Sequence, residues 1–252
     1  MGSKLRSVSA WVLLSLIMLP LFPVAWLVAL LTARFDPRRD RLRVFTATWV
    51  SLYGGTTPLY RFRIEGRQRI PGGPHVLVAN HESGLDVLCL LLLRTRARFL
   101  AESWMFRVPL SGRLFRRCRH IPVEPGDRES GRRALAAAAE ALAEGTPVAI
   151  FPEGRMFPDG LGSFRPGAFV AAQRAGVPLV PVLLEGTGQA WRPGSMLVQG
   201  RHDIRISVLE PLSADEVKSA EPDVLSARVR AALLAARRAA AADANPNPEE
   251  VP

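Results

Sequence analysis

The stretch that decides the fold is residues 75–93, which read His75-Val76-Leu77-Val78-Ala79-Asn80-His81-Glu82-Ser83-Gly84-Leu85-Asp86-Val87-Leu88-Cys89-Leu90-Leu91-Leu92-Leu93. Its first apolar run is short enough for a buried strand, and its last run is long enough for a buried helix. The polar residues between the two runs are therefore expected on the turn where the strand becomes the helix. Our working hypothesis is that His81 is a general base on this turn and that Asp86 orients it.

Spacing alone leaves other interpretations of these two residues open. On one continuous helix the side chains of His81 and Asp86 would point about 140° apart, so they meet only if His81 precedes the helix and Asp86 lies in its first turn. Ser83 and Asp86 also fit a capping box, in which Asp86 would merely cap the helix or complement its dipole. For His81 taken alone, a hydrogen-bonded structural histidine is the more ordinary role.

A second strand end also carries polar residues. The apolar residues 148–151 are followed by Pro152-Glu153-Gly154-Arg155, and ligands of open α/β sheets bind at the carboxyl ends of the strands. A plain turn is the alternative, because Pro and Gly make turns anyway. Arg165 lies downstream in a basic loop that opens a helix. Arg155 and Arg165 are candidates for binding a phosphate, although exposed arginines are usually only solvated.

Alternating strand and helix patterns predict one α/β domain over residues 59–212. The predicted strands are residues 75–79, 97–101, 118–123, 147–151, 178–184, 195–199 and 204–209. The predicted helices are residues 84–94, 128–143 and 166–175. Strands that are separated by helices indicate a mainly parallel central sheet flanked by helices.

Residues 1–58 are expected to form a membrane-associating element of two helices. Residues 11–31 contain no charged side chain and are about as long as the ~20 residues that cross a bilayer. Pro20 and Pro23 lie within this run and would kink a spanning helix or break it into a re-entrant hairpin. A signal peptide fits less well, because the run is long and no small-residue cleavage site follows it. Basic residues on both sides argue for cytoplasmic ends.

The second half of this element and the C-terminal region have their own patterns. Residues 42–53 carry a helical apolar stripe that includes Trp and Tyr, which suits a membrane interface or, alternatively, an ordinary core helix. Residues 213–240 are predicted to form terminal helices, with Ser213 and Glu216 in a capping box and Pro222 in a first turn. Residues 241–252 contain three prolines and are predicted to be a disordered tail.

The composition indicates an anionic partner. The formal net charge is +10, and 31 of the 33 basic residues are arginine. A membrane surface or a phosphorylated substrate fits this charge. A nucleic acid does not, because no helix-turn-helix, zinc finger or RNP motif accompanies the charge. Cys89 and Cys118 each lie alone, so we expect reduced core cysteines and no metal site.

Taken together, the two polar stretches resemble the glycerolipid acyltransferase family, whose best-known members acylate lysophosphatidic acid. Asn80–Asp86 matches the family block NHxSxxD, and Phe151–Gly154 matches the block FPEG. Residues 115–123, which end in Ile-Pro-Val, and the proline-centred strand 180–182 match two looser blocks. The resemblance covers about residues 60–212.

The chain departs from the family pattern at three basic positions. Glu102 precedes residues 103–106, where many relatives have Lys or Arg, and Pro125 follows Glu124, so that the nearest arginine is Arg128. The usual Thr-Arg after FPEG is Arg-Met here. These departures concern the contacts to the acceptor's phosphate and therefore the choice of acceptor.

The resemblance implies transfer of a fatty acyl group from acyl-CoA or acyl-carrier protein to the hydroxyl of a lysophospholipid, above all lysophosphatidic acid. His81 would take the hydroxyl proton, and Asp86 would fix the imidazole tautomer and stabilise the imidazolium. The family's blocks imply substrate-binding roles for Asn80, Ser83, Glu153, Gly154, Arg155, Arg128 and Arg165. No protein nucleophile, metal or cofactor is required. The expected location is the cytoplasmic face of a bacterial inner membrane.

Other readings remain open at the level of the sequence. The same chemistry could act on a lyso-ornithine lipid, another lysophospholipid or glycerol 3-phosphate. Water could replace the acceptor, which would make the protein a thioester hydrolase. The chain could also be a membrane-associated lipid-binding protein without activity. The oligomeric state is open as well.

Overall fold

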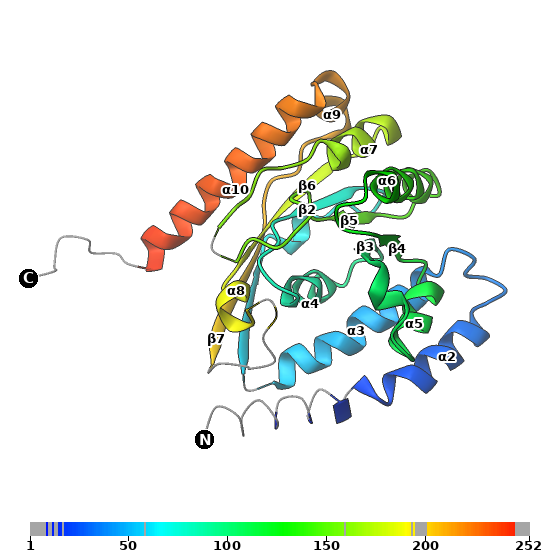
Figure 1. Ribbon diagram of the computed structural model, residues 1–252. Helices are drawn as coiled ribbons and strands as arrows, with labels where there is room; N and C mark the ends of the chain where they lie inside the picture. Colours follow the sequence, from blue (N-terminus) through cyan, green and yellow to red (C-terminus); the bar gives the residue numbers. More distant parts are fainter. Residues whose placement is uncertain are drawn as a thin grey trace, which may run out of the picture.

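The computed structural model describes residues 18–57, 59–158, 160–192 and 201–244, together with the single residues 9, 12, 15, 16 and 194. Within these ranges the chain forms a seven-stranded sheet between layers of helices (Figure 1). The strands are β1 Tyr60–Glu65, β2 Val76–Ala79, β3 Arg98–Glu102, β4 Ile121–Val123, β5 Val148–Ile150, β6 Leu179–Glu185 and β7 His202–Val208. Their order in the sheet is β1-β7-β6-β2-β5-β3-β4.

The helices cover both faces of the sheet. The α-helices are α2 Leu21–Leu31, α3 Asp40–Thr56, α4 Leu85–Leu92, α5 Ser111–Arg117, α6 Arg128–Ala143, α7 Gly167–Ala175, α8 Thr187–Ala190, α9 Ala214–Ser219 and α10 Pro222–Ala244. Two short 3₁₀-helices complete the described elements: η1 Arg67–Arg69 follows β1, and η2 Ser103–Phe106 follows β3.

Most neighbouring strands are parallel. Among the described strands, β6 and β7 form the one antiparallel pair, and β1 lies parallel to β7 at the edge. The prediction of a mainly parallel sheet flanked by helices is therefore confirmed. Strand β1 and the helices α5 and α8 were not predicted, and the predicted strand 195–199 lies outside the described residues.

Alternation along β2 builds two cores. Leu77 and Ala79 face α4 in one buried cluster, whereas Val76 and Val78 face α6, α7 and α10 in the other, because successive side chains of a strand point to opposite faces. Figure 1 shows α4 between the sheet and α3, with α6, α7 and α10 on the opposite side. The central strands β2, β5 and β6 are thus buried on both faces, as their continuous apolar sequences require.

The N-terminal run divides at a proline. Pro20 is the N-cap of α2, because a proline lacks the N–H that a helix interior needs but is tolerated where a helix starts. Leu21, Ala25 and Ala29 pack toward α3 and α5, whereas Leu30 and Leu31 on α2 are exposed. No helix in the described part of the chain is both long enough and apolar enough to span a membrane.

The C-terminal helices follow the predicted caps. Ser213 and Glu216 form the capping box of α9, and Pro222 is the first residue of α10. The predicted end of the helical region at residue 240 is wrong, because α10 continues to Ala244; alanine is the best helix former and favours that extension. The rest of the predicted tail lies outside the described residues.

Candidate active site

The turn at residues 80–84 lies at the carboxyl end of β2. Strand β2 ends at Ala79 and α4 begins at Leu85, as the apolar runs predict. Strand β5 pairs in parallel with β2, so the Phe151–Gly154 turn leaves the same edge of the sheet beside it. The topology therefore brings together the two polar stretches, which are about 70 residues apart in the sequence.

His81 and Asp86 form a direct hydrogen bond across this turn. His81 Nδ1 lies 2.8 Å from Asp86 Oδ2. The Asp86 side chain is fully buried, and the His81 side chain is 14% exposed. Since a carboxylate only accepts hydrogen bonds, Nδ1 carries the proton and Nε2 keeps a lone pair. Nε2 has no hydrogen-bond partner within the described residues and is therefore available to accept a proton.

Asp86 also holds the turn itself. The same Oδ2 atom accepts hydrogen bonds from the main-chain N–H groups of Glu82 at 2.6 Å and of Ser83 at 2.8 Å. The carboxylate therefore orients the histidine and satisfies two donors that precede α4. The structural role and the orienting role of Asp86 are performed by one oxygen atom, so they are not alternatives.

The second polar turn fixes the histidine from the other side. The ring of Phe151 stacks on the His81 imidazole, with ring centroids 4.1 Å apart and planes inclined by 14°. His81 N–H lies 3.4 Å from Glu153 Oε1, and Phe157 N–H donates to His81 C=O at 2.7 Å. The imidazole is thus held by its ring face, its Nδ1 atom and its main chain, which leaves Nε2 as its reactive atom.

Asn80 and Ser83 are positioning residues in this structure. Asn80 Nδ2 donates to Leu184 C=O at 2.8 Å, and Leu184 N–H donates to Asn80 Oδ1 at 2.7 Å. Ser83 Oγ donates to Trp191 C=O at 2.6 Å. Both side chains are fully buried. These side chains therefore anchor the turn to β6 and to the residue after α8, and their contacts to substrate stay a prediction. Asn80 Nδ2 also donates to Glu82 Oε1 at 3.3 Å, so both of its N–H groups are engaged within the chain.

Glu153 and Gly154 differ in their exposure. Glu153 is 3% exposed, its Oε2 atom has no hydrogen-bond partner, and burial raises its pKa to about 7. Gly154 is exposed, and its φ of 69° lies in the left-handed region, which favours glycine. A Cβ atom there would lie 3.0 Å from the Arg165 guanidinium. Glu153 therefore joins the two turns, and Gly154 lets Arg165 approach the site.

The three candidate arginines lie at different distances from the histidine. Arg155 and Arg165 are exposed. Arg155 directly follows the turn that stacks on His81, and its guanidinium lies 4.5 Å from the ring centroid of Phe157. Arg165 N–H donates to Pro152 C=O in that turn at 2.9 Å. Arg128 is exposed at the first position of α6, after β4. Strand β4 is three strands away from β2, about 14 Å along the sheet. Arg155 and Arg165 are therefore the closer candidates.

Two charged residues of the site were missed in the sequence. Arg237 on α10 forms an ion pair with the buried carboxylate of Glu82. Burial raises the pKa of Glu82 to about 7, against the effect of Arg237, and Asp86 raises it further. Glu82 stands inside the recognised block, but no spacing pattern links it to a residue 155 positions later. Among the described residues, no cluster of His, Cys, Asp or Glu could hold a metal ion.

Comparison with known proteins identifies the family. Residues 61–185 match the family model described as Acyltransferase, and the chain is 35% identical over 71% of its length to the chloroplastic 1-acyl-sn-glycerol-3-phosphate acyltransferase LPAT1 of Arabidopsis thaliana. Residues 61–185 of the chain belong to the acyltransferase family. The chain is also 34% identical, over 76% of its length, to a 1-acyl-sn-glycerol-3-phosphate acyltransferase from Chlamydomonas reinhardtii.

The matches cover these relatives only in part. The aligned region makes up 51% of the Arabidopsis protein and 58% of the Chlamydomonas protein, so the chain spans about half the length of the curated relatives that it matches. A solved structure is similar over nearly its whole length: PlsC, the 1-acyl-sn-glycerophosphate acyltransferase of Thermotoga maritima. Its TM-score is 0.73 at 21% identity, over 93% of this chain and 98% of PlsC. The two proteins share their fold.

Proposed function

We propose that this acyltransferase moves a fatty acyl group from an acyl thioester to the free hydroxyl of 1-acyl-sn-glycerol 3-phosphate, which yields phosphatidic acid. The observation that carries the proposal is the 2.8 Å hydrogen bond from His81 Nδ1 to Asp86 Oδ2, which leaves Nε2 as an oriented base. The acceptor is supported by the printed names of the relatives, which are 1-acyl-sn-glycerol-3-phosphate acyltransferases.

The reaction needs only one base and its orienting carboxylate. A hydroxyl is a weak nucleophile near neutral pH, so His81 Nε2 removes its proton while the oxygen attacks the thioester carbonyl carbon. A C–O bond forms and, when the tetrahedral intermediate collapses, the C–S bond breaks. The imidazolium returns the proton to the departing thiolate. Asp86 stabilises the imidazolium, as the carboxylate of a serine-protease triad does, and no acyl-enzyme is formed.

Arg155 and Arg165 are the proposed contacts for the acceptor's phosphate. Both are exposed beside the turn that stacks on His81, Arg155 directly after it and Arg165 bonded to it through Pro152 C=O, and a guanidinium can bind two phosphate oxygens at once. Glu102 supports a second candidate acceptor of the same chemistry. It ends β3 at this edge of the sheet and accepts a 2.7 Å hydrogen bond from Trp104 Nε1. A carboxylate stands there instead of a basic residue, which would suit an acceptor with a less negative head group, such as a lyso-ornithine lipid.

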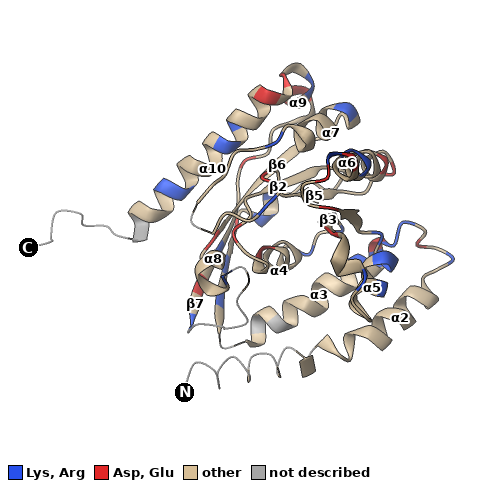
Figure 2. Ribbon diagram, in the orientation of Figure 1, with Lys and Arg blue, Asp and Glu red and all other residues tan. Residues whose placement is uncertain are grey.

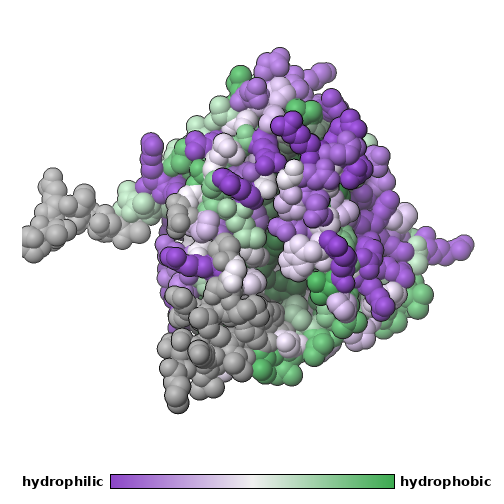
Figure 3. Space-filling view, viewed as in Figure 1, coloured by the Kyte–Doolittle hydropathy of each residue, from purple (hydrophilic) through white to green (hydrophobic). Residues whose placement is uncertain are grey.

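Membrane association is part of the proposal. Helix α2 carries no charged residue, and Figure 2 shows it uncharged along its length beside the basic α5. Hydrophobic side chains gather along the lower edge of the face in Figure 3, where α2 runs in Figure 1. An apolar helix face beside arginines suits the surface of an anionic bilayer. We place the protein on the cytoplasmic face of a bacterial inner membrane, with acyl-CoA or acyl-carrier protein as donor.

Product identification tests the proposal directly. The full chain, purified in detergent micelles, is incubated with acyl-CoA or acyl-carrier protein and a panel of lysolipids, and the products are identified by mass spectrometry. We expect phosphatidic acid from 1-acyl-sn-glycerol 3-phosphate, and none from the His81→Ala variant. If a different lysolipid is acylated, that lysolipid is the acceptor. Release of free fatty acid without any acceptor would indicate a hydrolase. Equal turnover by His81→Ala would exclude His81 as the base.

A further inference from the structure

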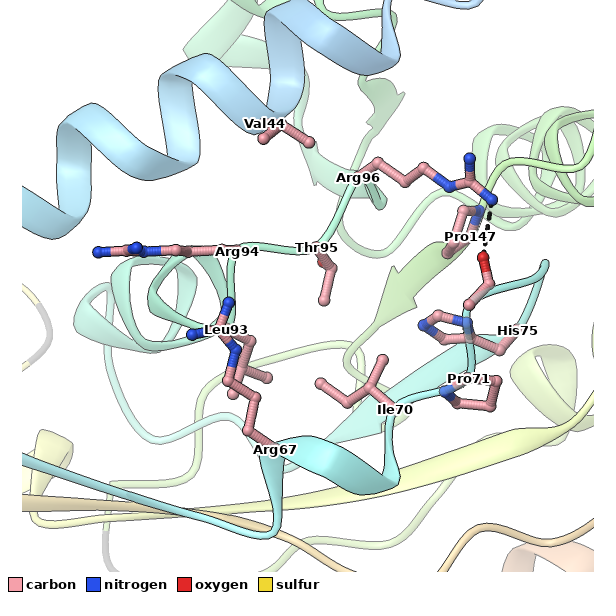
Figure 4. Close-up of a pocket in the computed structure, with 11 residues that line it drawn as sticks. Val44, Arg67, Ile70, Pro71, His75, Leu93, Arg94, Thr95, Arg96 and Pro147 are labelled. Carbon is pink, nitrogen blue, oxygen red and sulfur yellow. Dashed lines mark hydrogen bonds between the residues drawn. The ribbon is translucent and has the colours of Figure 1, made fainter.

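A second polar constellation lies at the opposite edge of the sheet, where β2, β3 and β5 begin. It surrounds a cavity of about 300 Å³ whose lining includes Val44, Arg67, Ile70, His75, Arg94 and Arg96. Figure 4 shows Arg67 and Arg94 at one end of this cavity, Arg96 and His75 at the other, and Ile70 and Thr95 between them. The cavity thus has an apolar middle and cationic ends.

A neighbouring cavity extends this site along α3 and β1. It has a volume of about 520 Å³ and shares Arg67 and Arg94 with the first. Arg61 and Arg201 also line it. Arg67 and Arg94 therefore line both cavities, which we call the joined cavities, and each cavity is of a size that suits a small organic ligand.

The arginines of the joined cavities have few internal partners. The guanidinium groups of Arg61, Arg67 and Arg201 make no ion pair within the described part of the chain. Arg94 Nε donates one long hydrogen bond of 3.4 Å to Ser51 Oγ. An arginine has five donors and no acceptor, so these side chains retain donors for an external anion.

Asp40, the acid that pairs with Arg96, also pairs with two other arginines. Arg96 lies 3.5 Å from Asp40 Oδ2 and donates to Gly72 C=O at 2.9 Å. Asp40 also pairs with Arg38 and with the buried Arg43. One carboxylate therefore serves three arginines, and the site keeps a positive excess.

His75 adds a buried polar atom without a partner. The residue is 2% exposed, and its Nδ1 lies 2.9 Å from Gly73 C=O. Nδ1 therefore carries the proton of the neutral ring, and Nε2 is an acceptor for which the described residues supply no donor. Figure 4 shows the imidazole directed toward the middle of the cavity. Buried acceptors nearly always pair with a donor, and a ligand hydroxyl in this cavity would satisfy His75 Nε2.

The backbone that carries these side chains is held rigidly. Arg43 is 2% exposed and donates to Arg96 C=O at 2.7 Å and to Cys118 C=O at 2.8 Å. Arg94 has a φ of 53°, in the left-handed region where a residue with a Cβ atom is strained. An arginine stands where glycine would end α4 without strain, and its guanidinium lines both cavities.

We propose that the joined cavities bind a phosphate ester whose carbon skeleton carries a free hydroxyl, as in a glycerol phosphate. Arg67 and Arg94 would hold the phosphate, and His75 Nε2 would accept a hydrogen bond from the hydroxyl. The exposed apolar side chains of Val44 and Ile64 beside these arginines favour the head group of an anionic lipid over a soluble ester. This site lies at the opposite edge of the sheet from His81 and is separate from the proposed reaction.

The test compares Arg67→Gln/Arg94→Gln with Arg132→Gln/Arg133→Gln, a matched pair that loses two exposed arginines from α6. The full chain is sedimented with phosphatidylcholine vesicles that contain or lack phosphatidylglycerol, and separately titrated with sn-glycerol 3-phosphate by calorimetry in micelles. We expect the first pair to bind phosphatidylglycerol vesicles roughly thirtyfold less tightly, because each basic residue at an anionic surface contributes about 1 kcal/mol. The second pair should bind as the unaltered chain does.

The outcomes separate the sources of the phosphate. Lost vesicle binding without any soluble binding assigns the site to a lipid head group, whereas glycerol phosphate binding that Arg67→Gln/Arg94→Gln removes assigns it to soluble esters. Equal losses in the two pairs, or no loss, would overturn the proposal. The rate of acyl transfer in micelles should stay the same in Arg67→Gln/Arg94→Gln, so this result does not depend on the proposed reaction.

Discussion

The two edges of the sheet treat polar side chains in opposite ways. At the carboxyl edge the side chains of the histidine turn are bonded to specific partners: His81 to Asp86, Asn80 to Leu184, Ser83 to Trp191 and Glu82 to Arg237. Asp86 Oδ1 and Glu153 Oε2 are the exceptions at these two turns. At the amino edge, arginines are exposed with few partners, and a buried histidine nitrogen has none among the described residues. Catalysis needs groups held in advance in one geometry, whereas recognition of an anion needs cations that remain accessible.

The largest expected effect comes from removing the charge of Asp86 at the carboxyl edge. Asp86→Asn keeps an oxygen that can accept from the Glu82 and Ser83 N–H groups but removes the charge that stabilises the imidazolium. We expect acyl transfer to fall about 10³- to 10⁴-fold, with little change in melting temperature. Initial rates and thermal denaturation measure the two effects.

Asp86→Ala is the companion variant, because it removes the acceptor as well as the charge. It should lose both activity and roughly 1–3 kcal/mol of stability, since two buried N–H donors are left without a partner. If Asp86→Asn were as unstable as Asp86→Ala while its folded fraction kept normal turnover, Asp86 would only be a structural residue.

A smaller effect is expected from the ion pair that joins α10 to the turn. Arg237→Ala leaves the buried carboxylate of Glu82 without its cation, which should cost roughly 1–3 kcal/mol of stability and lower activity about tenfold. Arg238→Ala, which removes the adjacent exposed arginine, is the control. Arg237→Lys should restore most of the loss. Equal melting temperatures and rates for the two alanine variants would show that the turn does not depend on α10.

The buried carboxylate of Glu153 predicts a pH effect. Its pKa is raised from an ordinary value of 4.5 to about 7, so the folded state holds the proton more tightly than the unfolded state. The resulting stability is fully present below about pH 4.5 and is lost as the pH rises through about 7. Between pH 5 and pH 8 the melting temperature of Glu153→Gln should therefore fall less than that of the unaltered chain. The exposed Glu140→Gln variant should follow the unaltered chain, and parallel curves for all three proteins would contradict the prediction.

The smallest effect separates stability from binding at the amino edge. Arg94→Gly relieves a left-handed backbone and should stabilise the fold by about 1 kcal/mol or less, because glycine is also more flexible when unfolded. Binding to phosphatidylglycerol vesicles should weaken in the same variant. Arg119, with a φ of 57° but outside the cavities, is the control: Arg119→Gly should leave vesicle binding unchanged. Denaturant titration and vesicle sedimentation measure the two effects.

Much of the fold was visible in local sequence patterns. Helix α6 has the predicted bounds, 128–143, because Asp127 caps it and alanine-rich turns follow. Strand β1 was missed although Tyr60, Phe62 and Ile64 alternate with charged residues. That alternation suits an edge strand with one polar face. The predicted strands are mostly continuous apolar runs, which indicate strands buried on both faces.

The site was predictable where its contacts are local or repeat a family pattern. The pairing of His81 with Asp86 follows from a strand, a turn and the first turn of a helix. The partners of Asn80 and Ser83 could not be foreseen, because Leu184 and Trp191 lie 104 and 108 residues away. A spacing rule describes only neighbours along the chain, so a buried Asn with satisfied bonds and an Asn that contacts substrate look the same in sequence.

The ion pair between Glu82 and Arg237 has a consequence for the order in which the protein is made. The ribosome adds Arg237 155 residues after Glu82. By then β2, β5 and the polar turns that follow these two strands have already been synthesised. A nascent chain that reaches only as far as α9 contains His81 and Asp86 but lacks the cation that neutralises the carboxylate between them. The turn that carries His81 is therefore completed by a helix that is synthesised long after the turn itself.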